Sequence, residues 1–301
     1  MLKSVTVTNA SNEKLVMPLA DPSKSGLAIF RIEGLGPPKA NINTTDLATA
    51  DGAVFNSSRV TPRNIVISVK IMEVPTIEIA RLRAYRYFPI KKRVKLEFET
   101  ANRKVETYGY VETNEPNIFS NQETAQISIL CPDPYFYATG AGQTIFSGVQ
   151  PLFEFPFSNE SLTEDLIEFG KIVSDTRADI LYQGDADTGL TITIHALDLV
   201  RHVTIFNVET YETMEIDTDR IQAITGRAFG FGDDIIISTV RGSRSARLLR
   251  DGVYTNIISA LNPDVDWFQI TPGDNVFTFT AEEGINAMSM TFAFKTAYGG
   301  I

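Results

Sequence analysis

The sequence predicts a mainly β protein of two domains, an N-terminal β-sandwich with one helix and a long hairpin, followed by an antiparallel β-sandwich. A length of 301 residues is enough for about two domains, at roughly 100–200 residues each. Apolar Val94, Leu96 and Phe98 alternate with charged residues, which is the period of two of a strand with one buried face. Turn residues punctuate the rest of the chain at short intervals, as in sandwiches.

The first domain is expected to contain six strands and one helix. The strand-like runs are residues 4–8, 27–32, 65–71, 93–99, 105–111 and 125–130. The helix is expected over residues 76–88, because Thr76 can cap it, Glu78 lies in its first turn and Pro89 ends it. Its inner face is predicted to carry Ile77, Ala80, Ala84 and Phe88. A β-hairpin follows over residues 91–111 and turns at Ala101–Asn102.

The domain boundary is predicted near residue 138. Pro132 and Pro134 break the last strand of the first domain, and residues 139–148 are rich in small residues, as in a linker. The two domains are therefore residues 1–138 and 139–301. The second is expected to be β throughout, with strands at 166–173, 180–182, 190–196, 202–207, 213–217, 234–238, 245–249, 267–270, 275–281 and 287–294.

The charges are distributed unevenly between these domains. Residues 1–138 carry 17 Lys and Arg against 14 Asp and Glu, a net of +3, and residues 139–301 carry 10 against 23, a net of −13. An acidic second domain argues against a nucleic-acid binder, because phosphate repels carboxylate. The single Cys131 rules out an internal disulfide, which fits assembly in a reducing cytoplasm. Neither a secretion signal nor a membrane span is expected.

No catalytic, cofactor or metal site is expected. His195 and His202 flank a predicted turn that could bring them together, but they lack the close spacing of zinc ligands. Residues 183–189 resemble a calcium loop but lack its third acid and terminal Glu, so we expect a plain turn. Cys131 is interpreted as a small buried residue, and no G-x-S-x-G motif is present. The conspicuous acids lie in predicted turns, where they are solvated.

A run of basic residues is the predicted functional surface. Seven cations lie between residues 81 and 95 with no acid among them: Arg81, Arg83, Arg86, Lys91, Lys92, Arg93 and Lys95. A solvated helix and hairpin would explain them structurally. As a functional surface, the run is expected to contact acidic groups of an adjacent subunit or neighbouring protein. Open strand edges in the hairpin at 91–111 would also invite pairing between subunits.

Several motifs resemble the distal tail (Dit) family of long-tailed bacteriophages. They are the Asp51–Gly52 turn, the R-N-I-V-I-S-V strand from Arg63, the helix with Tyr85 and Tyr87, and the C-P-D-P-Y-F segment at 131–136. In the second domain they are Asp266, Trp267 and Phe268, and the turn at 272–275. The order and spacing of these motifs over nearly the whole chain carry the resemblance.

The resemblance implies a structural protein of the virion that catalyses nothing. Residues 1–138 would be a ring-forming belt domain, and residues 139–301 a galectin-like or carbohydrate-module-like sandwich. The chain would form a homohexameric hub at the distal end of the tail, assembled in the host cytoplasm. Its partners would be the tail tube protein, the tip or baseplate protein and a receptor-binding protein, while DNA would cross the pore without specific binding.

Two other functions stay open at this stage. The second domain could make the chain a carbohydrate-binding adhesin that recognises the host surface. The sugar-binding His-Asn-Pro-Arg stretch of galectins is absent, however, and Trp267 is followed by Phe268 and not by Glu, so we expect Trp267 to pack against the core. A cell-wall hydrolase would need a carboxylate pair that the sequence does not identify.

Overall fold

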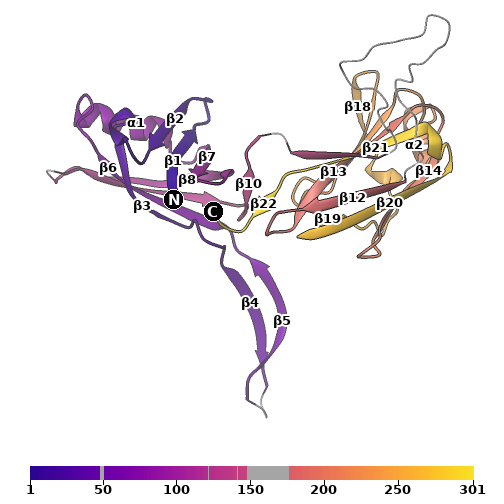
Figure 1. Cartoon of the computed structure of the whole chain (residues 1–301), viewed down its shortest axis with the longest axis horizontal. Helices are drawn as coiled ribbons and strands as arrows, with labels where there is room; N and C mark the ends of the chain where they lie inside the picture. The colour runs from indigo at the N-terminus through magenta and orange to yellow at the C-terminus, as the bar shows by residue number, and fades with distance from the viewer. Residues whose placement is uncertain (48–50, 121, 141, 148–175) are drawn as a thin grey trace, which may run out of the picture. The chain divides into compact units, whose positions relative to one another are not determined.

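The computed structural model describes residues 1–47, 51–120, 122–140, 142–147 and 176–301. The chain forms two units, an N-terminal unit of Met1–Gly140 and Ala297–Ile301, and a C-terminal unit of Ala141–Thr296. The sequence places a boundary near residue 138. It does not anticipate that the last five residues join the N-terminal unit (Figure 1).

The N-terminal unit is built on one antiparallel sheet with the strand order β2-β1-β7-β8-β9-β6-β3. A short strand, β10, pairs with both β8 and the C-terminal β22. The strands are β1 (Leu2–Thr8), β2 (Lys14–Pro18), β3 (Leu27–Glu33), β6 (Arg63–Ile71), β7 (Arg93–Thr100), β8 (Lys104–Asn117), β9 (Thr124–Cys131), β10 (Phe136–Ala138) and β22 (Ala297–Tyr298). All six expected strands are present, but they pair into one sheet and not into the two sheets of a sandwich.

Alternation along these strands buries one face of the sheet. Helix α1 (Ile77–Tyr87) contributes its buried Ala80 and Ala84 to the same core. Thr76 caps the helix as predicted, because its side chain accepts a hydrogen bond from the Ile79 N–H. The predicted turn at Ala101–Asn102 is also confirmed, since Thr100 N–H donates to the Arg103 carbonyl at that point. Central members of the core are Val5, Val7, Ile65, Ile67, Leu96, Phe98, Ile127 and Ile129.

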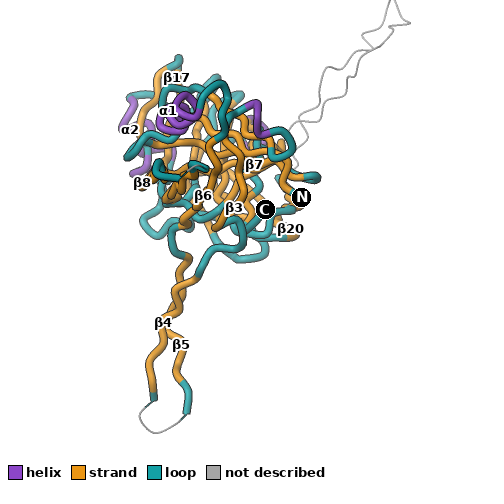
Figure 2. The backbone as a smooth tube through the Cα atoms, turned by 90° about the vertical axis from the view of Figure 1, so that its left-hand side faces the viewer, coloured by secondary structure: helices purple, strands orange, loops and turns teal. Residues whose placement is uncertain are grey.

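A second hairpin, which the sequence analysis misses, extends from the N-terminal unit. Among the described strands, β4 (Ala40–Asp46) and β5 (Ala53–Val60) pair only with each other. Every residue of both strands is exposed. In Figures 1 and 2 the hairpin extends away from the other strands of its unit. The Asp51–Gly52 turn precedes β5, where Gly52 has a φ of +96°.

The C-terminal unit contains two antiparallel sheets that share one core. One sheet has the order β11-β21-β13-β16-β17-β18, with β19 paired to β13, and the other has the order β12-β20-β14-β15. Inward residues such as Ile192, Phe292, Ile205 and Phe277 meet in that core. The strands are β11 (Gln143–Ser147), β12 (Arg177–Tyr182), β13 (Thr188–Ala196), β14 (Arg201–Asn207), β15 (Thr213–Ile216), β16 (Asp234–Ser238), β17 (Ser245–Arg250), β18 (Val253–Asn256), β19 (Gln269–Ile270), β20 (Gly273–Glu283) and β21 (Met288–Phe294).

The prediction that this half is β throughout is wrong at one place. Helix α2 (Thr218–Thr225) follows β15. The 3-10 turns η2 (Ile258–Ala260) and η3 (Ile285–Ala287) occur later in this unit, and η1 (Pro22–Lys24) lies in the N-terminal unit. Asp217 caps α2 by accepting from the Asp219 and Arg220 N–H groups, and Gly226 ends it in the left-handed conformation. The expected strand at 166–173 lies outside the described residues.

Candidate functional site

Four of the seven predicted interface cations are engaged within the chain. Arg81 pairs with Glu123 at 3.0 Å, Arg86 pairs with Glu13, and Arg83 donates to the Ser25 carbonyl. Lys95 contacts Glu97 at 2.9 Å and Glu106 at 2.8 Å. The absence of acids within the run was therefore misleading. Glu97 and Glu106 lie just beyond it in the same hairpin, and Glu13 and Glu123 come from connections distant in the chain. These contacts hold α1 and β7 in place.

The other three cations leave their charge at the surface. The Arg93 guanidinium lies 4.3 Å from the centre of the Tyr108 ring. Lys91 and Lys92 form no ion pair or side-chain hydrogen bond with any residue that the structure describes. That Lys91, Lys92 and Arg93 contact acidic groups of an adjacent subunit or neighbouring protein stays a prediction.

The hairpin at 91–111 has no open edge, which removes the reason for expecting strand pairing there. Its strand β7 pairs with β1 along Val5, Thr6 and Val7, and β8 pairs with β9. It therefore forms the middle of the sheet. Deleting residues 91–111 would remove two central strands, so that deletion cannot test ring assembly separately from folding.

Unpaired strand edges are found on the β4–β5 hairpin. Ile42 and Phe55 are 61% and 60% exposed, and Val54 and Leu47 are about half exposed. Cross-strand hydrogen bonds from Asn43 to Ser57 and from Asn56 to Thr45 hold the two strands in register. A two-stranded hairpin is marginally stable by itself in water. This hairpin, with apolar side chains and free edges, is the candidate assembly surface that the sequence analysis did not find.

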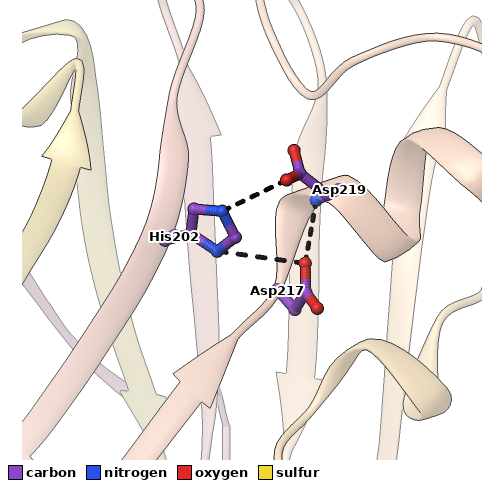
Figure 3. Close-up of side chains that lie close together, drawn as sticks. All are labelled: His202, Asp217 and Asp219. Carbon is purple, nitrogen blue, oxygen red and sulfur yellow. Dashed lines mark hydrogen bonds and ion pairs between the residues drawn. The ribbon is translucent and has the colours of Figure 1, made fainter.

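The two histidines do not meet. His195 on β13 contacts Asp234 of the neighbouring β16, with 2.7 Å between His195 Nδ1 and Asp234 Oδ1. His202 lies in the other sheet, near the start of β14. Its Nε2 is 3.4 Å from Asp219 and its Nδ1 is 3.9 Å from Asp217 (Figure 3). The expected turn therefore separates the histidines into two sheets.

The His202, Asp217 and Asp219 cluster has a structural explanation. Asp217 is the N-cap of α2, and its second carboxylate oxygen contacts Arg220 at 3.1 Å. The two carboxylates face different nitrogens of the His202 ring (Figure 3). One ligand atom from each of the three side chains lies within 4.8 Å of the others, but each carboxylate already contacts its own ring nitrogen. The cluster therefore anchors the start of α2 to β14.

The packing predicted for Cys131 and Trp267 is confirmed. Cys131 is fully buried, and burial raises the pKa of its thiol to about 11, so it is a poor nucleophile. Trp267 packs against the core of its unit beneath Arg244. Residues 183–187 connect β12 to β13, and the Tyr182 hydroxyl donates to the Ala186 carbonyl across this turn. In the part of the chain that the structure describes, no helix could span a membrane.

The whole chain resembles a solved phage protein. The crystal structure of the SPP1 Dit (gp 19.1) protein, described as a paradigm of hub adsorption apparatus in phages that infect Gram-positive hosts, aligns over 98% of this chain and 99% of that chain. The TM-score is 0.65 at 14% sequence identity. This similarity establishes a Dit-like fold, and it confirms the resemblance inferred from the motifs at the level of the fold.

Two structures of the phage P2 baseplate in its activated conformation, one with Ca and one with Sr, also align. Each has a TM-score of 0.46, at 10% and 11% identity, with coverage of 98% and 97% of this chain and the same shares of theirs. No protein-family model and no curated protein matches the sequence.

Proposed function

We propose that this chain is the hub of a phage tail, a non-catalytic structural protein that forms a homohexameric ring at the distal end. The ring joins the tail tube to the tip or baseplate protein and carries the receptor-binding apparatus. DNA crosses its pore without specific binding. Support comes from the Dit-like fold over almost the full length of the chain and from one structural feature, the uncovered β4–β5 hairpin.

The hairpin supports assembly because none of the described strands of the chain pairs with it or covers it. Both faces of β4 and β5 are exposed, and both outer edges are unpaired among the described strands. Exposed edges of this kind pair readily with another chain. A contact in which one subunit's hairpin lies on the next subunit is heterologous, and repeating it around an axis closes a ring.

The test replaces residues 41–59 with a short Gly-containing turn. The base of the hairpin is already closed, because Thr61 N–H donates to the Lys39 carbonyl at 3.0 Å, so the shortened chain can still fold. We expect the wild-type chain to have the mass of a hexamer by light scattering and the shortened chain to be a folded monomer. Rings that persist in the shortened chain would remove the hairpin from the interface.

A milder variant separates loss of contact from loss of the strand pair. Ile42→Ser together with Phe55→Ser keeps the backbone of the hairpin but removes its apolar surface, and should weaken the ring. Phe231→Ser is the matched control, because Phe231 is 81% exposed in the other unit. A wild-type chain that stays monomeric at high concentration and beside tail tube protein would contradict the proposed function itself.

A further inference from the structure

Among the residues that the structure describes, the β4–β5 hairpin is attached to its unit only at its base. Every residue of both strands is exposed, and the described strands offer them no other pairing partner. The hairpin extends away from the rest of its unit (Figure 2). Its direction therefore depends on two segments at the base, residues 34–39, which lead into it, and residues 61–63, which follow it.

One buried side chain joins these two segments. Arg63 follows the hairpin directly, and its side chain reaches back to the segment that leads into it. The Arg63 Nη1 donates to the Gly36 carbonyl at 2.6 Å and also to the Gly34 carbonyl. Arg63 is only 4% exposed, so these hydrogen bonds are shielded from water. The guanidinium thus holds both ends of the base together.

The C-terminal residues 297–301 contact the same base. The Gly299 carbonyl accepts a hydrogen bond from Nη2 of Arg63. The Ile301 N–H donates to the Leu35 carbonyl at 3.1 Å. The other end of this tail is held by the pairing of β22 with β10. The tail is therefore fixed on both sides of the point where it meets the base.

Gly300 lies directly on the segment that leads into the hairpin. A Cβ added there would lie 3.2 Å from the Leu35 carbonyl oxygen and 3.3 Å from backbone atoms of Gly36 and Pro37. All three neighbours are backbone atoms, which cannot turn aside as a flexible side chain can. Glycine permits this close approach of two backbones. The contact makes the position of the base sensitive to the position of the tail.

A small movement of the base is amplified along the hairpin. Strand β5 has eight residues. At roughly 3.3 Å per residue it is about 26 Å long, so a tilt of about 10° moves its far end by about 5 Å. A hairpin whose direction is already fixed loses less conformational freedom when it docks on another subunit. Control of the base is therefore control of docking.

We propose that residues 297–301 are a strap that fixes the direction of the β4–β5 hairpin for assembly. With the strap seated, Arg63 and the tail hold the base as one rigid block. With the strap displaced, the hairpin stays formed, because its two strands hold each other in register, but its direction varies. The strap's role in assembly rests on the proposed function, whereas its hold on the hairpin does not.

The first test measures the direction of the hairpin by pulsed electron paramagnetic resonance between two nitroxide labels. Ser58→Cys on β5 and Asn102→Cys in the β7–β8 turn are exposed positions, and the native Cys131 is buried and escapes labelling. The full-length chain also carries Ile42→Ser and Phe55→Ser and is measured at a concentration where light scattering shows monomers. Distances between subunits then do not contribute.

We expect one narrow distance distribution with the native tail and a wider one after Gly300→Ala, because the added methyl group displaces the strap. Deleting residues 297–301 should widen the distribution further. Gly300→Ala keeps every hydrogen-bonding group of the tail, so it provides the test if the shortened chain does not fold. A distribution that is already wide with the native tail, or that Gly300→Ala leaves unchanged, would overturn the proposal.

Gly36→Ala is the matched control for this measurement. It makes the same substitution within the base, but no atom lies within 4 Å of the position of its added Cβ. It also keeps the carbonyl that accepts from Arg63. Gly36→Ala should leave the distance distribution as narrow as that of the native chain. Equal widening by Gly36→Ala and Gly300→Ala would show that the tail contact has no special role.

The second test measures assembly with Ile42 and Phe55 intact and without labels. By light scattering, Gly300→Ala should raise the protein concentration at which half the chains are in rings by about two- to tenfold, and Gly36→Ala should not. A Gly300→Ala chain with a wide distribution that still assembles like the wild type would overturn the strap's role in assembly. A wild type that never forms rings, but whose label distances respond to Gly300→Ala, would contradict the hub and support the strap's hold on the hairpin.

Discussion

At the scale of single residues, Arg63 shows what can be predicted from the sequence. Its position at the start of a strand is evident from the apolar run that follows. Its role is not, because its partners are backbone carbonyls far apart in the chain. The guanidinium donates to Pro134 at 2.7 Å, to Gly36 at 2.6 Å, and also to Gly34 and Gly299. Every residue has a backbone carbonyl, so the sequence cannot show which carbonyls accept hydrogen bonds from Arg63.

Arg63→Met should be strongly destabilising. Arg63 is buried, and its ring partner Phe136 lies 4.3 Å from the guanidinium; methionine would remove its hydrogen bonds to four backbone carbonyls. We expect a loss of about 3 kcal/mol in the free energy of unfolding, since each unsatisfied buried group costs about 1–3 kcal/mol. Urea unfolding measures this. Arg59→Met on the exposed hairpin is the control, and a change below about 0.5 kcal/mol for Arg63→Met would contradict the assignment.

The Glu13–Arg86 pair should make stability depend on pH in acid. Hydrogen bonds from Arg86 and Asn9 lower the pKa of Glu13 from 4.5 to about 2. A lowered folded-state pKa stabilises the protein above the unfolded value and loses this contribution as the pH falls. Wild type should therefore exceed Glu13→Gln in melting temperature at pH 7, and the difference should disappear between pH 4.5 and about 2. A difference that persists unchanged at pH 2 would disprove this.

At the scale of elements, core-facing strands were predicted well and elements without a buried face were not. The strands that face a core alternate clearly, as Ile127, Ile129 and Cys131 do on β9. The strands of the β4–β5 hairpin face no core, so selection for burial leaves no period of two in them. Their register comes from polar pairs such as Asn43 with Ser57, which a pattern of hydrophobicity cannot reveal.

Helix α2 was missed although its signals are present. Asp217 provides an N-cap and Gly226 stands just past its end, which together mark a short helix. Its only fully apolar anchor is Ile221, because eight residues give little room for a repeating apolar face. In the sequence analysis a strand instead ends at residue 217, and no element is assigned to residues 218–225. The His202 contacts could not be predicted without that helix.

Asp217→Ala tests the structural role of the histidine–carboxylate cluster. Loss of an N-cap costs about 1 kcal/mol, and the variant also loses the Arg220 contact. We expect the C-terminal unit to lose about 1–2 kcal/mol by urea unfolding. Glu209→Ala, an exposed acid elsewhere in that unit, should change stability by less than about 0.5 kcal/mol. Stability that depends on added zinc in the wild type, and not in Asp217→Ala, would instead favour a metal site.

At the scale of the whole molecule, the two units have separate cores and opposite charges. The sequence predicts this division from the charge asymmetry and from the proline-rich end of β9. It does not predict that the chain returns to the first unit at its end. Two residues of β22 are too few to show a strand pattern, and their pairing with β10 depends on a partner about 160 positions earlier.

Removing residues 297–301 should destabilise the N-terminal unit alone. The truncation removes the β10–β22 pair, the Gly299 carbonyl that receives a hydrogen bond from Arg63, and the bond from Ile301 N–H to the Leu35 carbonyl. It also removes Tyr298, whose ring lies 4.6 Å from the Arg103 guanidinium. None of these groups belongs to the C-terminal core. Separate cores are expected to unfold in separate transitions, so calorimetry should show one transition moving to lower temperature and the other unchanged. A variant in which the transition of the C-terminal unit moves equally would show that the two units unfold as one.

Arg63 loses a partner in the same truncation. Combining the truncation with Arg63→Met should therefore lower the free energy of unfolding by less than the sum of the two separate losses.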